Sequence, residues 1–322
     1  MLIGHQRIWN LLIKSVSRER LAHAYLFCGP EQVGKATLAK EFAKWLFCEQ
    51  KKKDQDPPCG KCRSCLDLDK DQHPDLFIIK ANESEESLTE IGIEKIRALQ
   101  RQLLFYPYKS SFKIVIIEEA HRLTAEAANA FLKTLEEPGP NSIIILTSSS
   151  LGLILPTIFS RCQVIRFFSV PFKQMEEGLR KEKGKFSDLD RVLELSAGRP
   201  GYAKRLINDK KFLLENEGGK KQLEDILKSD LVFRFEIAKD LSQNIPLARQ
   251  LLSLWALCLR DQLLRASKQR NSPARGDILD DYFGQSPASL SKVCHEIERT
   301  RSLLQNSSFN ARLVLEALLM KV

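Results

Sequence analysis

A short segment near the N-terminus constrains the fold more than any other part of the chain. Residues 27–42 read FCGPEQVGKATLAKEF, with Gly29, four intervening residues, and then Gly34 and Lys35. This is the spacing of a phosphate-binding loop, in which backbone N–H groups and a helix N-terminus hold phosphates while the lysine reaches the terminal ones. Such a loop needs a strand before it and a helix after it, so the segment predicts an α/β fold.

The sequence on both sides of the loop meets this requirement. The apolar run 24–28 is typical of a buried strand, and Leu38, Phe42 and Trp45 follow the loop at helical spacing. The alternative is a glycine turn that caps an ordinary helix. The succession of strand, loop and helix favours a nucleotide-binding fold, whether active or degenerate.

Further strands and helices alternate along the chain. Short β-branched runs, DLFIIK, FKIVIIEEA and NSIIILTSS, are separated by the helical segments GIEKIRALQRQLLF and TAEAANAFLKTLEE. This alternation predicts a parallel α/β sheet over roughly residues 20–168.

The remainder of the chain has helical patterns only. Residues 172–210 are typical of small helices, and residues 212–322 are helical, with 246–266 apolar on nearly all sides and therefore expected at the centre of a bundle. A polar loop is expected at 267–277. We therefore expect three domains: an α/β domain at 1–168, a small helical domain at 169–211, and a helical domain at 212–322.

Composition limits the class of protein. The chain has 322 residues, of which 43% are hydrophobic and 28% charged, which is typical of a globular protein. The net charge of +9 favours a polyanionic partner such as nucleic acid, although a solvated basic surface has the same signature. The N-terminus lacks the pattern of a secretory signal, and the longest apolar run is interrupted by Gly152 and Pro156. We expect a cytoplasmic protein with no membrane span.

Four cysteines form the most specific motif. Cys59, Cys62 and Cys65 follow one another at two-residue intervals, and Cys48 lies upstream of them. Cysteines in the cytosol are mostly reduced, and four thiolates suit tetrahedral Zn²⁺. The cluster predicts a closed, structural zinc site; the alternative is unpaired surface thiols. The remaining cysteines occur singly in apolar surroundings and are expected to be packing residues: Cys28, Cys162, Cys258 and Cys294.

The residues that would hold magnesium depart from those of an active site. Ala36 stands where a Ser or Thr ligand belongs, and Thr37 points about 100° further round the helix. Glu118 stands where an Asp usually meets the magnesium shell. Glu119 has two interpretations, a catalytic base or an acid that stabilises a helix N-terminus.

Several motifs together resemble one family. The segments HAYLFCGPEQVGK, NAFLKTLEEPGPN, LPTIFSRCQVIRF and NSSFNARLVLEALLMKV, with the cysteine cluster, are similar to the AAA+ clamp-loader family of bacteria, and within it to the delta-prime subunits of DNA polymerase III. The resemblance extends from end to end of the chain, and LKTLEEP and SRC are its most specific markers.

The resemblance implies a hetero-pentamer of motor and delta subunits that loads a sliding clamp onto primed template DNA. It implies that Arg161 of SRC acts in trans as an arginine finger on the ATP of a neighbouring motor subunit. An intramolecular ion pair is the alternative role of Arg161. The resemblance places Ser149 or Ser150 at the polar sensor position of motor subunits, and residues 212–322 in the collar that holds the ring together.

Departures from the motor subunits distinguish the subunit types. Motor subunits have a lid arginine that senses the γ-phosphate, and Gly201 falls at that position here. With Ala36 and Glu118, this difference implies that the chain hydrolyses little or no ATP. ATP or ADP binding stays open, with a degenerate loop as its site: Gly29, Gly34, Lys35 and Thr37.

Alternatives remain at this stage. The chain could be an ATP-hydrolysing motor subunit of the same loader, which would show turnover that depends on Lys35. It could also be an independent AAA+ DNA motor that forms a homo-hexamer, although the cysteines and LKTLEEP count against this. A zinc-dependent DNA-binding regulator is disfavoured because no recognition helix flanks the cysteines at finger spacing.

Overall fold

The structure is a computed structural model that describes residues 2–50, 57–81, 90–183, 188–266, 287–304 and 309–321. The chain divides into two compact units. The first unit consists of Met1–Val170 with Arg199–Gly201, and the second of Pro171–Gly198 with Tyr202–Val322.

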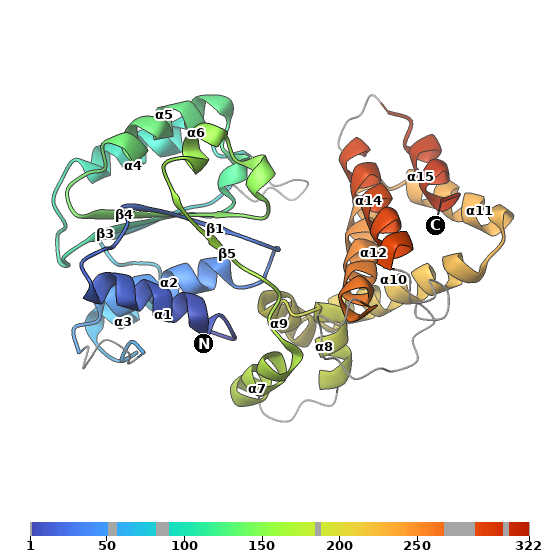
Figure 1. Cartoon of the computed structure of the whole chain (residues 1–322), viewed down its shortest axis with the longest axis horizontal. Coiled ribbons are helices and arrows are strands. Elements are labelled where there is room, and N and C mark those ends of the chain that lie inside the picture. The colour runs from blue at the N-terminus through green and yellow to red at the C-terminus, as the bar shows by residue number, and fades with distance from the viewer. Residues whose placement is uncertain are drawn as a thin grey trace. The chain divides into compact units, whose positions relative to one another are not determined.

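The first unit is built on a five-stranded parallel sheet with the strand order β2-β3-β4-β1-β5 (Figure 1). The strands are β1 (Ala24–Cys28), β2 (Leu76–Ile79), β3 (Lys113–Ile117), β4 (Ser142–Ser148) and β5 (Gln163–Arg166). The predicted parallel α/β sheet is confirmed. Strand β5 has a weaker sequence signal than the others because only Ile165 among its residues is buried.

Helices cover both faces of this sheet. On one face lie α1 (Gln6–Ser17), α2 (Lys35–Phe47) and α3 (Arg63–Asp69). On the other lie α4 (Ile93–Leu103), α5 (Ala125–Glu136) and α6 (Pro156–Phe159), together with the short 3₁₀ helices η1 (Ala120–Arg122) and η2 (Leu151–Leu153) (Figure 1).

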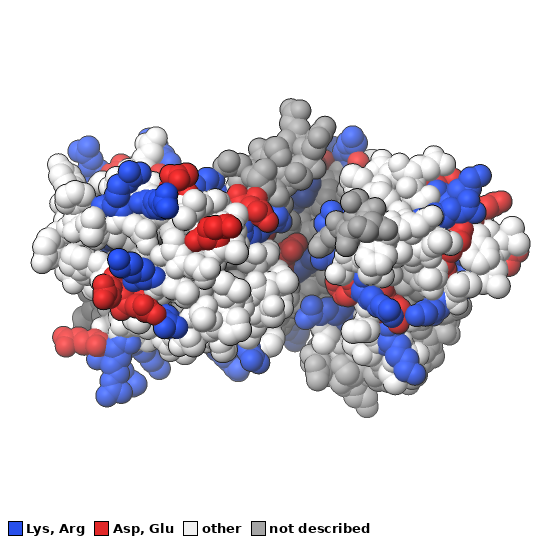
Figure 2. Space-filling model, turned by 90° about the horizontal axis from the view of Figure 1, so that it is seen from above, with Lys and Arg blue, Asp and Glu red and all other residues white. Residues whose placement is uncertain are grey.

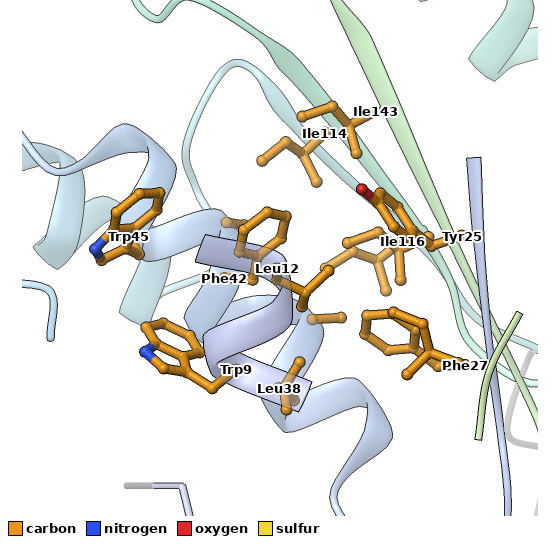
Figure 3. Packing of buried hydrophobic residues seen from close by; sticks show 14 of the residues in the cluster. Trp9, Leu12, Tyr25, Phe27, Leu38, Phe42, Trp45, Ile114, Ile116 and Ile143 are labelled. Carbon is orange, nitrogen blue, oxygen red and sulfur yellow. The ribbon is translucent and has the colours of Figure 1, made fainter. Parts of the chain in front are cut away.

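Side chains of the central strands alternate between two hydrophobic cores. In β1, Tyr25 and Phe27 point to the core under α1 and α2, while Leu26 points to the core under α4 and α5. Figure 3 shows the first core, in which Phe42 and Trp45 pack against each other with ring centroids 6.4 Å apart. Since burial of each such side chain stabilises by about 1.5–3 kcal/mol, the strand-by-strand alternation fixes the register of the sheet.

The parallel sheet brings distant parts of the sequence to one edge. Cys28, the last residue of β1, lies beside Ser148, the last residue of β4, and Ile117 of β3 lies beside Leu146. The carboxyl ends of β1, β3 and β4 therefore meet at the same edge. This is the edge at which open parallel sheets carry ligand sites.

The second unit is entirely helical among its described residues, as the sequence predicts. Its helices are α7 (Phe172–Lys183), α8 (Leu189–Ser196), most of α9 (Pro200–Asn208), α10 (Lys210–Lys228), α11 (Leu231–Ser242), α12 (Ile245–Ala266), α14 (Pro287–Leu303) and α15 (Ala311–Leu319). The loop predicted at 267–277 lies outside the described residues. None of the described helices combines the length and apolar character needed to cross a membrane.

Helix α12 is central to this unit, as its apolar sequence predicts. Trp255 is buried, and its indole Nε1 donates a 2.9 Å hydrogen bond to the carbonyl of Gly219 in α10. A Cβ atom at Gly219 would lie 2.6 Å from Leu254, so the glycine permits the two helices to approach closely.

Candidate functional site

The predicted phosphate loop lies between β1 and α2, at the carboxyl edge of the sheet. Gly29 has φ +155° and Gly34, the N-cap of α2, has φ +108°. A Cβ atom at Gly29 would lie 2.3 Å from the carbonyl oxygen of Phe167, so only glycine fits beside β5. The amide of Gly29 also donates to the carbonyl of Ser148, which ties the loop to β4 at 3.1 Å.

Lys35 is folded back onto its own loop. Its Nζ donates to the carbonyl oxygens of Gly29 and Pro30, both at 2.6 Å, and the residue is 8% exposed. Burial lowers the pKa of Lys35 to about 8, against the opposing effect of the Glu31 carboxylate. Carbonyl oxygens of the same loop therefore accept two of the three hydrogen bonds that the Lys35 ammonium group can donate.

The first turn of α2 has the side chains expected from the sequence. Ala36 is half-buried and Thr37 is exposed, beside the buried Lys35. Ala36 has no oxygen with which to bind a metal ion, and the Lys35 side chain is directed to the loop carbonyls.

Gly201, which the resemblance places at the lid-arginine position, contacts the loop directly. Its amide donates a 2.8 Å hydrogen bond to the carbonyl of Gln32, whose φ is +57°. A Cβ atom at Gly201 would lie 2.9 Å from that oxygen and 3.2 Å from the Gln32 Cβ. The position is thus occupied at close range by the loop backbone, and any side chain there would displace it.

The two acids that follow β3 each form an ion pair. Glu118 lies 3.3 Å from Lys80 Nζ, and Glu119 accepts a 2.6 Å hydrogen bond from Nε of Arg122. Glu119 has φ +53° and immediately precedes η1, while its amide donates to the Thr147 hydroxyl. Glu119 thus immediately precedes a short helix at the carboxyl edge of the sheet, and both interpretations of it stay predictions.

The serines after β4 cap the next turn. Ser150 accepts a hydrogen bond from the amide of Gly152, whereas Ser149 is half-buried. The buried Ser148 donates to the Ser150 carbonyl, and its Oγ lies 3.4 Å from Nδ1 of His121. Sequence reasoning assigned no role to Ser148 or His121, because neither forms part of a recognisable motif.

Two histidines border the loop region. His5 Nε2 donates a 2.9 Å hydrogen bond to the carbonyl of Val33, and its ring packs on Phe167. Burial lowers the pKa of both His5 and His121. Both rings are thereby biased toward the neutral form at physiological pH, and only the folded chain shows that they lie near the loop.

Arg161 follows α6 on the surface of the first unit. Its Nη2 lies 2.5 Å from Oε1 of Glu136, and its Nη1 donates to the Thr157 carbonyl at 3.0 Å and to the Ser160 hydroxyl at 3.3 Å. The side chains of Arg161 and Glu136 are 36% and 51% exposed. Arg161 thus forms an intramolecular ion pair, the alternative to its role as an arginine finger. Its guanidinium group is still accessible to solvent.

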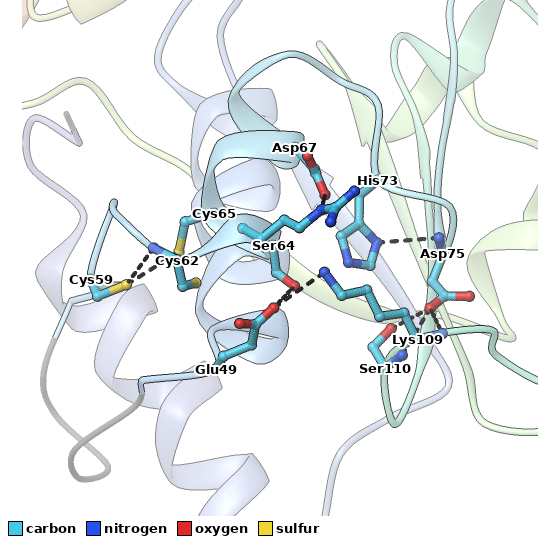
Figure 4. Close-up of polar contacts among 11 residues, drawn as sticks. Glu49, Cys59, Cys62, Ser64, Cys65, Asp67, His73, Asp75, Lys109 and Ser110 are labelled. Carbon is cyan, nitrogen blue, oxygen red and sulfur yellow. Dashed lines mark hydrogen bonds and ion pairs between the residues drawn. The ribbon is translucent and has the colours of Figure 1, made fainter.

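The four predicted cysteines come together. The Sγ atoms of Cys48, Cys59, Cys62 and Cys65 all lie within 4.8 Å of one another. Those of Cys59 and Cys65 are 3.9 Å apart (Figure 4). Tetrahedral zinc with Zn–S bonds of about 2.3 Å separates its sulfurs by about 3.8 Å, so the donor set fits Zn²⁺.

Backbone amides support the sulfurs of this cluster. The amides of Lys61 and Cys62 donate to Sγ of Cys59, and the amide of Cys59 donates to Sγ of Cys48. The two amide donors lower the pKa of Cys59 to about 6, whereas burial raises the pKa of Cys65. Amide donors of this kind stabilise thiolates, the form in which cysteine binds metal.

The cluster is connected to the sheet by polar contacts. Glu49 accepts a 2.7 Å hydrogen bond from the Ser64 hydroxyl and lies 3.2 Å from Lys109 Nζ. The buried carboxylate of Asp75 accepts hydrogen bonds from the amides of Tyr108, Lys109 and Ser110. Figure 4 shows Asp75 beside Lys109 and Ser110. These contacts link the cysteine segment to the turn that precedes β3.

The isolated cysteines lie in apolar surroundings, as predicted. Cys28 is buried at the end of β1, and Cys162 packs beside the core under α4 and α5. Cys258 and Cys294 pack against the core of the second unit. Burial raises the pKa of Cys162 to about 12, which makes its thiol unreactive.

Comparison with known proteins identifies the family. A family model described as DNA polymerase III, delta subunit, matches residues 4–171, just over half of the 322 residues. The DNA polymerase III subunit delta′ of Bacillus subtilis is 35% identical over 175 residues, which are 54% of this chain and 50% of that protein. The subunit delta′ of Pseudomonas aeruginosa is 29% identical over 330 residues, 98% of this chain and 95% of that protein.

A relative of another subunit type also matches. The DNA polymerase III subunit tau of Bacillus subtilis is 36% identical over 165 residues, 51% of this chain but only 28% of that protein. The matches to the two Bacillus proteins thus span half of their length or less. With its parallel α/β domain and the helices that follow, this chain has the AAA+ fold predicted from the sequence, and it belongs to the DNA polymerase III delta-prime family of clamp-loader subunits.

Proposed function

We propose that this chain is the delta-prime stator of a DNA polymerase III clamp loader. It helps to load a sliding clamp on primed DNA, donates Arg161 to the nucleotide of a neighbouring motor subunit, and hydrolyses little or no ATP itself. The observation that carries this proposal is the contrast between Lys35, which its own loop binds, and Arg161, which is accessible on the surface.

The state of the phosphate loop supports the absence of hydrolysis. Nucleotide phosphates would have to replace the carbonyls of Gly29 and Pro30 as partners of Lys35. Ala36 offers no oxygen to magnesium, and Glu118 is directed toward Lys80. Both departures affect the magnesium site, and phosphoryl transfer requires a bound magnesium ion.

The surroundings of Arg161 support its role in trans. Because both partners of the ion pair are more than one-third exposed, water screens it, and such pairs contribute about 0–1 kcal/mol. A phosphate of a neighbouring subunit would compete readily for the guanidinium. Arginine suits this role because its planar fork binds phosphate oxygens in a bidentate manner.

We propose the motor and delta subunits as partners in a hetero-pentamer, held together by the helical domain at 212–322, with 169–211 as the lid. The sliding clamp is a further partner that we propose. The first unit offers large exposed apolar side chains for a protein contact, and they are 68–87% exposed: Leu104, Phe105, Tyr106 and Tyr108.

Zinc would have a structural role in this protein. Cys48, Cys59, Cys62 and Cys65 would hold it, and four protein ligands leave no open position for a substrate. The ion would connect Cys48, which directly follows α2, to Cys65 in α3. A replication role would also place the chain in the cytosol, as the sequence predicts.

Steady-state ATP hydrolysis by the reconstituted loader, with clamp and primed DNA, tests the proposal. We compare wild type with Arg161→Ala and Lys35→Ala in this chain. Arg161→Ala should lower turnover, because arginine fingers accelerate hydrolysis about 10³- to 10⁵-fold at the site they serve. Lys35→Ala should leave turnover nearly unchanged.

A motor subunit is the second candidate, since Gly29, Gly34 and Lys35 are retained and a tau subunit matches the first unit. In that case the isolated chain would hydrolyse ATP, and Lys35→Ala would abolish this activity. That result, with no effect of Arg161→Ala on the neighbour, would exclude the stator.

A further inference from the structure

A groove on the outer face of α1 is lined mainly by cations. It has a volume of about 450 Å³, and its charged lining consists of Arg7, Lys14, Arg18 and Arg20. The other lining residues are polar or apolar, so no acid contributes to it. We call these four residues the cationic groove.

The helical repeat explains why these side chains share one face. Arg7, Lys14 and Arg18 are separated by seven and four residues, which returns each side chain to the same side of a helix. The opposite side of α1 carries Trp9 and Leu12, which are buried in the core against α2. The buried side therefore fixes the direction in which the cations point.

A turn at the end of α1 adds the fourth cation. The amide of Glu19 donates to the carbonyl of Val16 at 3.0 Å, and that of Arg20 donates to Ser15 at 2.9 Å. These two bonds form a Schellman motif, with Glu19 at φ +54° in the position that glycine usually takes. The turn folds the chain back so that Arg20 lines the groove beside Lys14.

The cations of the groove lack the acidic partners that other surface cations have. Within the described part of the chain, none of the four forms an ion pair. By contrast, Lys40 pairs with Asp71 at 2.8 Å and Lys44 with Asp69 at 2.6 Å on neighbouring elements. Figure 2 shows a different face of the first unit, where basic and acidic side chains lie intermixed.

We propose that the cationic groove binds the phosphodiester backbone of DNA. Unpaired cations along one line in a concave surface attract a polyanion, and each Lys or Arg that neutralises a phosphate releases a counterion. Arg7, Arg18 and Arg20 provide guanidinium groups, which suit phosphate oxygens. The groove presents no row of amides or carboxylates for base edges, so the contact is independent of sequence.

An anionic membrane fits the groove less well. A helix that lies on a membrane inserts an apolar face, but the apolar face of α1 is already buried in the first unit. The groove exposes one large apolar side chain, Leu11, which is 44% exposed. DNA needs only the cations, and the family of this chain acts in DNA replication.

This inference rests on the proposed function only for the identity of the polyanion. Binding by the groove requires neither nucleotide nor neighbouring subunits. It can therefore be measured on the full chain alone, so that its failure and the failure of the stator proposal are distinguishable.

The test compares two quadruple variants that each remove four positive charges. The groove variant carries Arg7→Gln, Lys14→Gln, Arg18→Gln and Arg20→Gln. The control variant changes four exposed lysines of α10: Lys210→Gln, Lys211→Gln, Lys221→Gln and Lys228→Gln. Fluorescence anisotropy with labelled duplex and single-stranded DNA, at several salt concentrations, gives the affinity and its salt dependence.

We expect the groove variant to bind DNA at least about tenfold more weakly than the control. The slope of log affinity against log salt for the duplex should fall by about 3 to 4, the value for four lost phosphate contacts. Both variants should keep the melting temperature of wild type, since the substituted side chains are exposed.

Other results would overturn the inference. Equal weakening in both variants would mean that net charge alone attracts DNA, and no weakening in either would mean that the groove does not contact it. Loss of binding to vesicles rich in phosphatidylserine, with DNA binding intact, would identify a membrane site instead. If the groove variant keeps its DNA binding and loses only its assembly with the other loader subunits, the groove is a protein interface.

Discussion

The amide of Gly201 donates a 2.8 Å hydrogen bond to the carbonyl of Gln32, although 169 positions separate the two residues (201 − 32) in the sequence. The bond joins the start of α9 to the middle of the phosphate loop. A Cβ atom at Gly201 would lie 2.9 Å from the same oxygen.

Gly201→Ala should therefore destabilise the chain by about 1–3 kcal/mol, because overpacking against a fixed backbone forces the loop to shift. Gly218→Ala is the matched control, since Gly218 lies in α10 and no atom is within 4 Å of its added Cβ. That change should be neutral or stabilise by up to about 1 kcal/mol. Chemical denaturation measures both; equal effects of the two changes would show that the contact with Gln32 is unimportant.

Lys35 should make the free energy of unfolding increase as the pH rises above neutrality. The folded pKa of about 8 lies below the ordinary value of 10.5, so between these values the unfolded chain binds a proton that the folded chain has released. This residue's contribution therefore increases with pH, by about 2 kcal/mol between pH 7.5 and pH 10. Denaturation of wild type and Lys35→Met at both values isolates the effect, because other titrating groups are common to both. Parallel pH dependence in the two proteins would contradict it.

Arg161→Lys should lower loader turnover nearly as much as Arg161→Ala. A lysine keeps the charge but lacks the planar guanidinium group. Its ammonium group therefore cannot contact Glu136, the Thr157 carbonyl and a phosphate at the same time. The folded stability should stay within about 1 kcal/mol of wild type, since the ion pair is exposed. The control is Arg180→Lys, another exposed arginine in an ion pair, which should leave turnover unchanged. Full turnover with Arg161→Lys would show that charge alone is sufficient.

The purified protein should contain one zinc ion per chain, and the Cys62→Ser variant should contain none. Four thiolates within 4.8 Å form a complete tetrahedral set, and loss of one sulfur removes a ligand that no other side chain in the described part of the chain replaces. Metal analysis and the melting temperature, with and without a chelator, measure this. Cys258→Ser is the control, because Cys258 packs against the second core, and it should retain the metal. Zinc-free wild type with an unchanged melting temperature would contradict a structural metal.

Asp75→Asn should destabilise the first unit by about 1–3 kcal/mol. The buried carboxylate accepts four hydrogen bonds from residues 108–110, and an amide cannot accept them all. Although burial acts to raise the pKa of Asp75, these donors outweigh it and lower the pKa.

Because the folded pKa is depressed, the stabilisation by Asp75 is present above the ordinary pKa and is lost as the pH falls through the lowered value. Denaturation at pH 7 and in acid tests the sign. Asp71→Asn, at an exposed ion pair, serves as control and should have little effect. A similar loss in both variants would point to general charge effects.

Local patterns in the sequence predicted much of the fold. Strands β1 to β4 are continuous apolar runs because helices bury both faces of a parallel sheet, and such runs are visible without a structure. The cysteine cluster was also predictable, since three of its members lie within seven residues of one another. In both cases the signal lies in residues that are close in sequence.

The details that distinguish the site depend on contacts between distant segments. Nothing local indicates that Arg161 pairs with Glu136, or that His5 binds the carbonyl of Val33. Lys35 is a local case that was also missed, because the same spacing suits a lysine that reaches outward and one that folds back. Such alternatives differ in side-chain torsion, which spacing does not determine.

Bonds within the chain hold the phosphate loop: Gly29 to Ser148, His5 to Val33, Lys35 to the loop carbonyls, and Gln32 to Gly201. None of these contacts uses the side chain at position 36. Shape and chemistry in this loop are therefore separable, and a lineage can exchange the residue that binds magnesium without remodelling the domain. The loop can therefore connect β1 to α2 in the same conformation whether or not position 36 carries a metal ligand.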